Sequence, residues 1–470
     1  MAGKGAGSGV SGTLMGVAGQ AEPRAPGGPL PPGEAHRRGH EALSRGDLET
    51  GIGFLRIAVE GAPRNGAWRC ELTQALMDAE EAPEAFFHLN EALCLSPPYQ
   101  PAARLLSKLF KAIVIDNVSG QVPPSLVAAL SCEGVDYQPI VDGSIRVLKE
   151  LTPLGEALRV GREQGWPTAA AWLLGEEGRT VLEDGLLRAC LARGVNVDTD
   201  VERLLTALRR HLLLEAPCNI LDEEPLAGFL VALVRQCVTN EFVFGEDDDE
   251  RTAVEALSVE PERVLKGGPG ATQELVLHAL YRPLPESFQG MWKKLRYARA
   301  LPKGLREYLA GELRARDQEA AITAGLESLT ALTDEISAKV ATQYEENPYP
   351  RWLSVDLPPP GTTRALIEPA FDATLLKTQG RPLDVLVAGC GTGRQAILWA
   401  HGLGPKERVL AVDISRASIA YGLRMARSLK VPNIRFLQAD ILDLAGLEQD
   451  FDFITSVGVL HHMADPVKGW

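Results

Sequence analysis

The sequence lacks any excess of basic residues and any long apolar run. Its 470 residues include 48 Lys and Arg against 62 Asp and Glu, which gives a net charge of −14 at pH 7. General nucleic-acid binders carry a basic face or stripe, so this charge balance argues against that class. Apolar runs such as Leu230–Val234 are far too short to cross a bilayer. We therefore expect neither a nucleic-acid nor a membrane partner.

Cysteine is scarce, and aromatic residues are missing from the first 36 positions. The seven cysteines are scattered, and the N-terminus lacks the apolar core of a secretory signal, which is typical of a protein in the reducing cytoplasm. Residues 1–36 are rich in Gly, Pro, Ala and Ser and contain no Phe, Trp or Tyr. Such a segment cannot bury enough apolar surface to fold, so we expect a disordered tail over 1–36.

A repeat follows the tail. Ala58 and Pro63 recur 34 residues later as Ala92 and Pro97, and this spacing is the period of tetratricopeptide repeats. Small residues let paired helices approach closely, and proline ends the second helix of each pair. We expect tetratricopeptide-like helices over 37–115, whose concave face could bind a protein or peptide partner. The equally favoured alternative is that these helices simply continue the helical region behind them.

Residues 116–343 predict an all-helical region. One apolar stripe at helical spacing comprises Val201, Leu204, Leu205, Leu208 and Leu212. An acidic run over 246–250 is interpreted as a solvated turn, because five adjacent acids do not match calcium-loop spacing. We expect no metal site in the chain.

The chemistry is concentrated in a glycine-rich turn near the C-terminus. The apolar run Leu383–Ala388 predicts a buried parallel strand, and Gly389, Gly391 and Gly393 follow it before a helical pattern begins. A strand, a glycine turn and a helix N-terminus present bare backbone N–H groups to a nucleotide-like ligand. In the dinucleotide fingerprint the third glycine comes one place later, where this chain has Arg394. This spacing disfavours a nicotinamide-dependent oxidoreductase.

Polar residues follow the next two predicted strands. Asp413 ends the strand that begins at Arg408, where a carboxylate can accept hydrogen bonds from both hydroxyls of a ribose. An Asp in that position can alternatively cap the following turn. The strand over 433–438 leads into Asp440, which can accept from an adenine amino group, and Ile441, which offers an apolar face.

Four pieces of the sequence resemble the class I S-adenosylmethionine-dependent methyltransferases. They are AGCGTG at 388–393, VLAVDIS at 409–415, QADILDL at 438–444 and FDFITSVGVLHHMADP at 451–466. Together with YEENPYPRW at 344–352, they resemble bacterial methyltransferases that carry N-terminal tetratricopeptide repeats. The resemblance implies a Rossmann-like α/β domain and S-adenosyl-L-methionine as cofactor.

The resemblance also implies a role for each matching residue. The three glycines would line the methionine and ribose portion, and Asp413 with its neighbour Ile414 would hold the ribose. Asp440 and Ile441 would hold the adenine, and Gly458 would face the sulfonium. Many family members carry Asp or Glu two residues before the first glycine, where this chain has Val387, so the cofactor's amino group needs another partner.

Methyl transfer from a sulfonium needs alignment and exclusion of water more than a general base. The candidates for proton transfer or substrate contact are His461, His462 and Tyr349. For the histidines, local packing around the cofactor is the favoured alternative. Tyr349, Arg351 and Trp352 lie in a proline-rich connector that could form a lid over the cofactor or a clamp between the helices and the sheet.

The expected architecture is multi-domain, with an all-α N-terminal region followed by the α/β domain. The expected parts are a tail over 1–36, repeat-like helices over 37–115, a helical domain over 116–343, a connector over 344–375 and a methyltransferase domain over 376–470. The family's sheet has the order 3-2-1-4-5-7-6, and only strands 3, 2, 1 and 4 are predicted here, so we expect the domain to be incomplete at the C-terminus. The expected function is methyl transfer to a protein or small molecule. The alternative is a repeat-based scaffold with an inactive or regulatory cofactor-binding domain.

Overall fold

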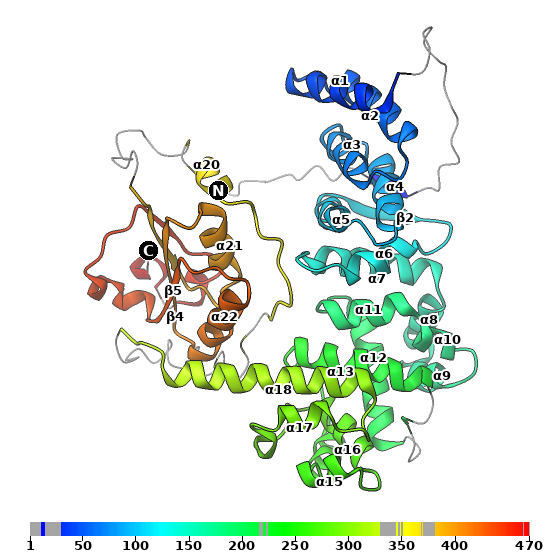
Figure 1. Cartoon of the computed structure of the whole chain (residues 1–470). Coiled ribbons are helices and arrows are strands. Elements are labelled where there is room, and N and C mark those ends of the chain that lie inside the picture. Colours follow the sequence, from blue (N-terminus) through cyan, green and yellow to red (C-terminus); the bar gives the residue numbers. More distant parts are fainter. Residues whose placement is uncertain are drawn as a thin grey trace. The chain divides into compact units, whose positions relative to one another are not determined.

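The chain divides into two units in the computed structural model (Figure 1). One unit comprises residues 1–236 and 244–256, and the other comprises 237–243 and 257–470. The structure describes residues 11–14, 30–215, 220–221, 224–329, 345, 348, 351–367, 369, 381–463 and 465–469. Tyr349 and most of the predicted connector therefore lie outside the described residues, as does the side chain of His462.

The first unit consists almost entirely of helices that follow one another closely along the chain. Its elements are β1 Ser11–Leu14, α1 Pro32–Ser44, α2 Leu48–Gly61, α3 Gly66–Asp78, α4 Ala82–Leu93, α5 Gln100–Ala112, β2 Val114–Val118, α6 Pro124–Ser131, α7 Tyr137–Leu151, α8 Leu154–Gln164, α9 Trp166–Leu174, α10 Arg179–Glu183, α11 Gly185–Arg193, α12 Thr199–Leu214, α13 Glu224–Thr239 and α14 Asp248–Glu255. The last residues of α13 belong to the second unit. None of the described helices in either unit is both long and apolar enough to cross a membrane.

The first helices repeat at a constant interval. Helices α1, α3 and α5 begin at Pro32, Gly66 and Gln100, so that successive starts lie 34 residues apart. The two alanines that marked the repeat in the sequence, Ala58 and Ala92, are fully buried in α2 and α4. Small side chains at these points allow the neighbouring helices to approach, and whether the helices form tetratricopeptide-like pairs stays a prediction.

The structure contains elements that were not predicted, in the expected tail and at the start of the region expected to be all-helical. Helix α1 begins at Pro32, inside the segment expected to be disordered, and β1 lies in that segment too. Proline at the first positions of a helix has its φ already set for the first turn, so a proline can signal a helix start as well as disorder. Strand β1 pairs in parallel with β2, whose sequence begins Val114-Ile115, an apolar β-branched pair that favours a strand.

One other local prediction is confirmed and one is corrected. The apolar stripe of α12 is buried along its whole length, at Val201, Leu204, Leu205, Leu208 and Leu212. The acidic run is not simply a solvated turn, because its last three residues begin α14 and Glu250 is buried. Asp247 accepts from the N–H of Glu250 at 2.9 Å and the Glu250 carboxylate accepts from the N–H of Asp247 at 2.9 Å. This reciprocal capping box satisfies two N–H groups at the helix start, which explains acids at these positions in structural terms.

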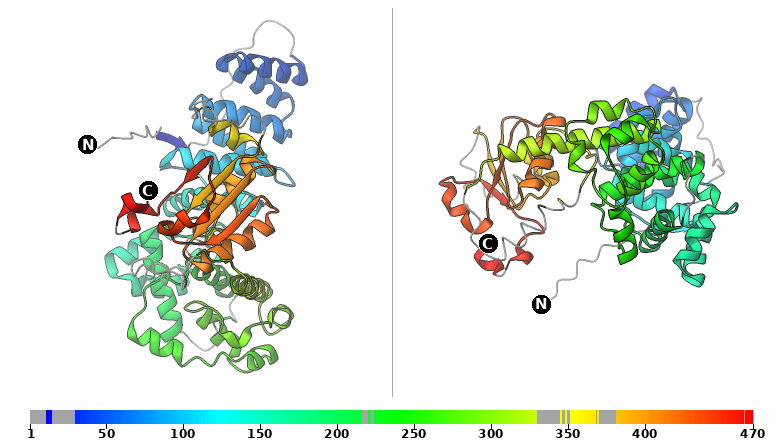
Figure 2. Two further views of the ribbon diagram at one scale, coloured as in Figure 1. Left: turned by 90° about the vertical axis from the view of Figure 1, so that its left-hand side faces the viewer. Right: turned by 90° about the horizontal axis from the view of Figure 1, so that it is seen from below.

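The second unit combines further helices with a parallel sheet. Its elements are α15 Pro261–Lys266, α16 Ala271–Ala279, η1 Glu286–Phe288, α17 Trp292–Arg296, α18 Lys303–Ala324, α20 Thr362–Ile367, β3 Asp384–Ala388, α21 Arg394–Leu403, β4 Arg408–Asp413, α22 Arg416–Ser428, β5 Ile434–Gln438, η3 Ile441–Leu447, β6 Phe453–Thr455, η4 Leu460–His462 and α23 Pro466–Gly469. The four strands lie in the order β5-β4-β3-β6, and each pair is parallel (Figure 2). This is the order 3-2-1-4 that the sequence predicts, and it is the sheet of a Rossmann-like domain.

The two faces of this sheet bury alternate residues of the central strands β3 and β4. Val385 and Val387 of β3 pack on one face against α21 and α22. Leu386 and Ala388 pack on the other face, where η3 supplies Leu444 and Leu447. Because both faces are covered there, β3 and β4 are almost continuously apolar in sequence, as buried parallel strands are. The carboxyl ends of β3, β4 and β5 therefore meet at one edge, where the glycine turn lies.

Candidate cofactor site

The glycine turn is held to the neighbouring strand by its own backbone. The N–H groups of Gly389 and Cys390 both donate to the carbonyl oxygen of Val412 at 2.8 Å. Gly389, Gly391 and Gly393 have φ values of +75°, +51° and +79°. Residues with a Cβ avoid this left-handed region, so the alternate glycines are what allow the chain to turn from β3 into α21.

The space around the three glycines differs. A Cβ at Gly389 would lie 2.3 Å from Cγ2 of Val459, and a Cβ at Gly393 would lie 3.0 Å from Cα of Gly422 in α22. A Cβ at Gly391 would meet no atom within 4 Å. Gly389 and Gly393 are therefore required by packing, whereas Gly391 borders open space at the end of the sheet. That space is where a ligand can approach the backbone closely.

Asp413 lies directly beside this opening, at the end of β4. Its Oδ2 accepts from the N–H of Gly391 at 2.7 Å, and its Oδ1 accepts from the N–H of Ser415 at 3.0 Å. Burial raises the pKa of the Asp413 carboxyl, while hydrogen bonds from backbone N–H groups oppose that rise. Asp413 therefore caps the turn that follows β4, which is the alternative role predicted for it. This role does not exclude ribose binding, because each carboxylate oxygen can accept more than one hydrogen bond.

Asp440 and Ile441 follow the next strand at the same edge. The Asp440 side chain is 5% exposed and its Oδ1 accepts from the N–H of Leu442 at 2.9 Å, which caps η3. The Gln438 side-chain amide donates to the carbonyl oxygen of Ile414 at 3.0 Å and ties the ends of β4 and β5 together. The structure therefore brings Asp413, Ile414, Asp440 and Ile441 to one edge, as the sequence predicts.

The segment after β6 is less informative about catalysis. Gly458 has a φ of +71°, and a Cβ there would meet nothing within 4 Å, so this turn is also open. His461 is exposed in η4. Val387, at the position where related enzymes often carry an acid, is buried in β3 and offers no polar group to a ligand.

Trp352 and Arg351 pack against the elements that carry the site. The indole N–H of Trp352 donates to the carbonyl oxygen of Thr392 in the glycine turn at 3.1 Å, and the Tyr421 hydroxyl donates to the Trp352 carbonyl at 2.6 Å. Arg351 forms ion pairs with Glu241 and Glu312, the latter at 2.7 Å, and lies 5.5 Å from the ring centre of Tyr421. For these two residues, the contacts match the clamp interpretation rather than the lid.

Glu345 contacts the site from a distant segment and was not among the predicted residues. Its carboxylate accepts from the N–H of Ala417 at 3.1 Å and from the N–H of Arg416, at the N-terminus of α22. A helix N-terminus attracts negative charge because its first N–H groups have no partner within the helix. Spacing in the sequence cannot reveal such a contact, because the two segments are distant along the chain. Gly422 was missed for the same reason.

A cavity of about 440 Å³ lies between Glu345 and the Arg351 cluster. Two carboxylates, those of Glu241 and Glu312, share the single guanidinium of Arg351. Burial raises the pKa of Glu241 from 4.5 to about 7, although Arg351 opposes the rise. The folded protein therefore binds this proton more tightly than the unfolded chain does.

Replacing Glu241 with Gln should change the pH dependence of stability. A raised folded-state pKa gives stability that is present below pH 4.5 and is lost as the pH rises through about 7. Glu241→Gln removes that loss, so at pH 8 the variant should be more stable than the parent by about 1 to 3 kcal/mol. Urea unfolding at pH 5 and pH 8 measures the difference, with the exposed Glu307→Gln as control. A variant less stable than the parent at pH 8 would show that the ionised pair is net stabilising.

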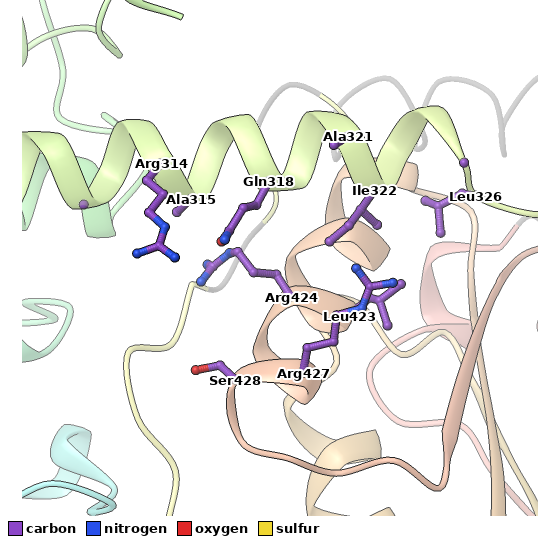
Figure 3. A pocket seen from close by; sticks show the side chains of 12 residues that line it. Arg314, Ala315, Gln318, Ala321, Ile322, Leu326, Leu423, Arg424, Arg427 and Ser428 are labelled. Atoms are coloured by element: carbon purple, nitrogen blue, oxygen red, sulfur yellow. The ribbon is translucent and has the colours of Figure 1, made fainter. Parts of the chain in front are cut away.

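A second, more open groove of about 850 Å³ lies between α18 and α22 (Figure 3). The side chains of Arg314 and Arg424 point into it, and Arg424 also donates to Glu319 at 2.7 Å. Its α22 residues come from the second half of that helix, and the residues predicted to bind the cofactor are not among those that line it.

Comparison with known proteins gives partial matches to this chain. A family model described as a methyltransferase domain matches residues 381–469. An uncharacterized protein of Synechococcus sp. is 38% identical over 143 residues, which are 30% of this chain and 34% of that protein. Trans-aconitate 2-methyltransferase of Deinococcus radiodurans is 35% identical over 97 residues, which are 21% of this chain and 34% of that enzyme. The chain thus spans about a third of the length of these relatives, and its C-terminal region carries a methyltransferase domain.

Proposed function

We propose that this chain binds S-adenosyl-L-methionine at the carboxyl ends of β3, β4 and β5 and transfers its methyl group to an acceptor. The observation that carries the proposal is the open side of Gly391, whose N–H is held by Asp413 at 2.7 Å. The match of residues 381–469 to a methyltransferase domain supports it, because that family typically uses this cofactor.

The residues at this edge offer the kinds of group that the cofactor would need. The backbone at Gly389 and Gly391 would face its methionine and ribose portion, and Asp413 would accept from the ribose hydroxyls. Asp440 would accept from the adenine amino group, beside the apolar side chain of Ile441. Because Val387 carries no acceptor, the cofactor's amino group would need a backbone carbonyl.

When bound, the cofactor supplies an electrophilic methyl group on sulfur, together with a good leaving group. The task of the chain's own residues is then to hold the reacting atoms in line and to exclude water. Trp352 supports this by fixing the carbonyl of Thr392, which keeps the glycine turn in place. His461, His462 and Tyr349 remain candidates for contact with the acceptor, and a proton acceptor is needed only where the acceptor's pKa is high.

For the methyl acceptor and the binding partner, we propose only the chemical class. The 34-residue interval of the first helices supports tetratricopeptide-like pairs that bind a protein or peptide, so a protein acceptor is one alternative. A small molecule is the other, and the relative named for trans-aconitate makes a small carboxylic acid a sensible member of a test panel. None of the six described cysteines forms a disulfide, which agrees with a reducing cytoplasmic location.

Radiolabelled methyl transfer tests the proposed function. The purified protein is incubated with S-adenosylmethionine carrying a labelled methyl group and with a cell lysate or the carboxylic acid panel. We expect label in the protein fraction for a protein acceptor and in the small-molecule fraction otherwise, and no label with Asp413→Ala. Binding of the cofactor without any transfer would favour the scaffold alternative. Binding of NADH in place of S-adenosylmethionine would exclude both the methyltransferase and the scaffold hypotheses.

A further inference from the structure

Two histidines and a glutamate converge in the first unit, far along the chain from the methyltransferase domain. His36 and His40 lie one turn apart on α1, and Glu71 lies on α3. The Nε2 of His40 is 3.0 Å from Oε2 of Glu71, and the Nε2 of His36 contacts the same oxygen. One donor atom from each residue lies within 4.8 Å of the other two.

We propose that His36, His40 and Glu71 form a binding site for a divalent transition-metal ion, with zinc as the first candidate. Two histidines four residues apart on a helix face present their rings to one point, which is the arrangement that holds zinc in helical metal sites. A carboxylate completes a common three-ligand set. Ligand bonds of about 2.0 to 2.2 Å place donor atoms roughly 3.5 Å apart around a tetrahedral ion, so small side-chain shifts would seat an ion between donor atoms that lie within 4.8 Å of one another.

The surroundings orient the rings and leave one side open. The His36 ring stacks on Trp68 at a centroid distance of 4.7 Å and an angle of 18°, which limits its rotation. The side chains of His36, Glu71 and His40 are 22%, 37% and 53% exposed, so an ion can enter from the His40 side. Three protein ligands and an exposed face leave a position for water or for an incoming ligand, as in zinc sites that keep an open position.

Neighbouring charges do not occupy the site. The two arginines between the histidines, Arg37 and Arg38, are paired with Glu34, and Arg37 also pairs with Glu41. Their cations are therefore engaged along α1 and not with Glu71. A bound ion would link α1 to α3, the first helices of successive pairs.

No metal site was expected from the sequence, because the acidic run does not match calcium-loop spacing. His36 and His40 were not recognised as a pair on one helix face, because His36 lies in the segment that was expected to be disordered. The third ligand comes from another helix, and its approach depends on how the helix pairs pack.

Calorimetric titration of zinc chloride into untagged, chelator-treated protein tests the site. We expect saturable binding of one ion per chain, abolished in His36→Ala/His40→Ala and weakened at least tenfold in Glu71→Gln and in His40→Ala. His40 is largely exposed, so its replacement should leave the circular dichroism unchanged. Substitution with Co²⁺ should give visible absorption bands in the parent protein that are missing from the double variant.

His211 provides a matched control. Its ring is 22% exposed, like that of His36, and its Nδ1 lies 3.2 Å from Glu215, but the second histidine is missing from this pair. His211→Ala should therefore bind zinc as the parent does. If the parent binds no ion, or if His40→Ala and Glu71→Gln bind as tightly as the parent, the cluster is an ion pair only and the proposal is wrong.

Discussion

Replacing Asp413 with Ala should weaken the binding of S-adenosylmethionine by about 100-fold or more. Hydrogen bonds to a charged group contribute about 1.5 to 3 kcal/mol each, and two ribose hydroxyls would donate to this carboxylate. A loss of about 3 to 5 kcal/mol corresponds to a rise in Kd of roughly 150-fold to 4,000-fold. The same change also releases the N–H of Gly391, which Asp413 holds at 2.7 Å, so the turn itself loses support.

Isothermal titration calorimetry measures this effect, with circular dichroism to confirm the fold. Asp413→Asn keeps one acceptor oxygen and should bind more tightly than Asp413→Ala but more weakly than the parent. Asp450, exposed before β6, lies at the amino end of the strands, so Asp450→Ala should bind as the parent does. Unchanged binding in Asp413→Ala would remove the ribose role and leave only the capping role.

The pH dependence of binding offers an independent check on the same carboxylate. Burial raises the pKa of Asp413, so this group takes up a proton at a higher pH than a solvated Asp does. A protonated carboxyl is a weaker acceptor for the ribose hydroxyls, so affinity should fall as the pH is lowered through that raised pKa. Asp413→Asn, which cannot titrate, should lack this component of the pH profile.

The strands and the edge that they form were predictable from sequence because local patterns determine them. The run before Gly389 is short, apolar and ended by glycine, and Asp413 and Asp440 each follow another such run. In parallel strands the carboxyl ends meet at one edge, so strand assignment alone is enough to bring these residues together. The order of the strands was expected from the resemblance to the methyltransferase family, and the observed order agrees with it.

Contacts between distant segments could not be predicted in this way. Glu345 reaches the N-terminus of α22, and Gly422 lies against Gly393, yet neither position has a distinctive neighbour in sequence. Their roles come from how helices pack on the sheet. The His36 and Glu71 pairing has the same origin, and the proline-rich start of α1 concealed it further.

The different surroundings of Gly391 and Gly393 predict opposite consequences for the same substitution. Both glycines have positive φ, so alanine at either position costs about 1 to 2 kcal/mol of backbone strain. At Gly393 the new Cβ would also lie 3.0 Å from Cα of Gly422 and 3.1 Å from the Phe436 ring. Backbone cannot move aside cheaply, so Gly393→Ala should lower the free energy of unfolding by about 2 to 4 kcal/mol in total.

At Gly391 the new Cβ would enter open space and meet no protein atom within 4 Å. Gly391→Ala should therefore cost only the strain of about 1 to 2 kcal/mol in stability. Its methyl group would instead occupy the space where the cofactor approaches the backbone, so binding should weaken at least about tenfold, or roughly 1.4 kcal/mol. Gly393→Ala should retain more affinity per folded molecule, because its Cβ is directed at α22 rather than at the opening.

Urea unfolding and cofactor titration of both variants, at a temperature where both are folded, separate the two roles. Gly446, which is exposed in η3 and whose Cβ would also meet nothing within 4 Å, gives the control Gly446→Ala, with neither effect expected. If Gly391→Ala binds the cofactor as tightly as the parent, the open side of the turn is not the ligand side, and the cofactor site must be placed elsewhere. If instead Gly391→Ala loses as much stability as Gly393→Ala, folding alone requires glycine at both positions. The open space beside Asp413 would then be no evidence that the turn binds a ligand.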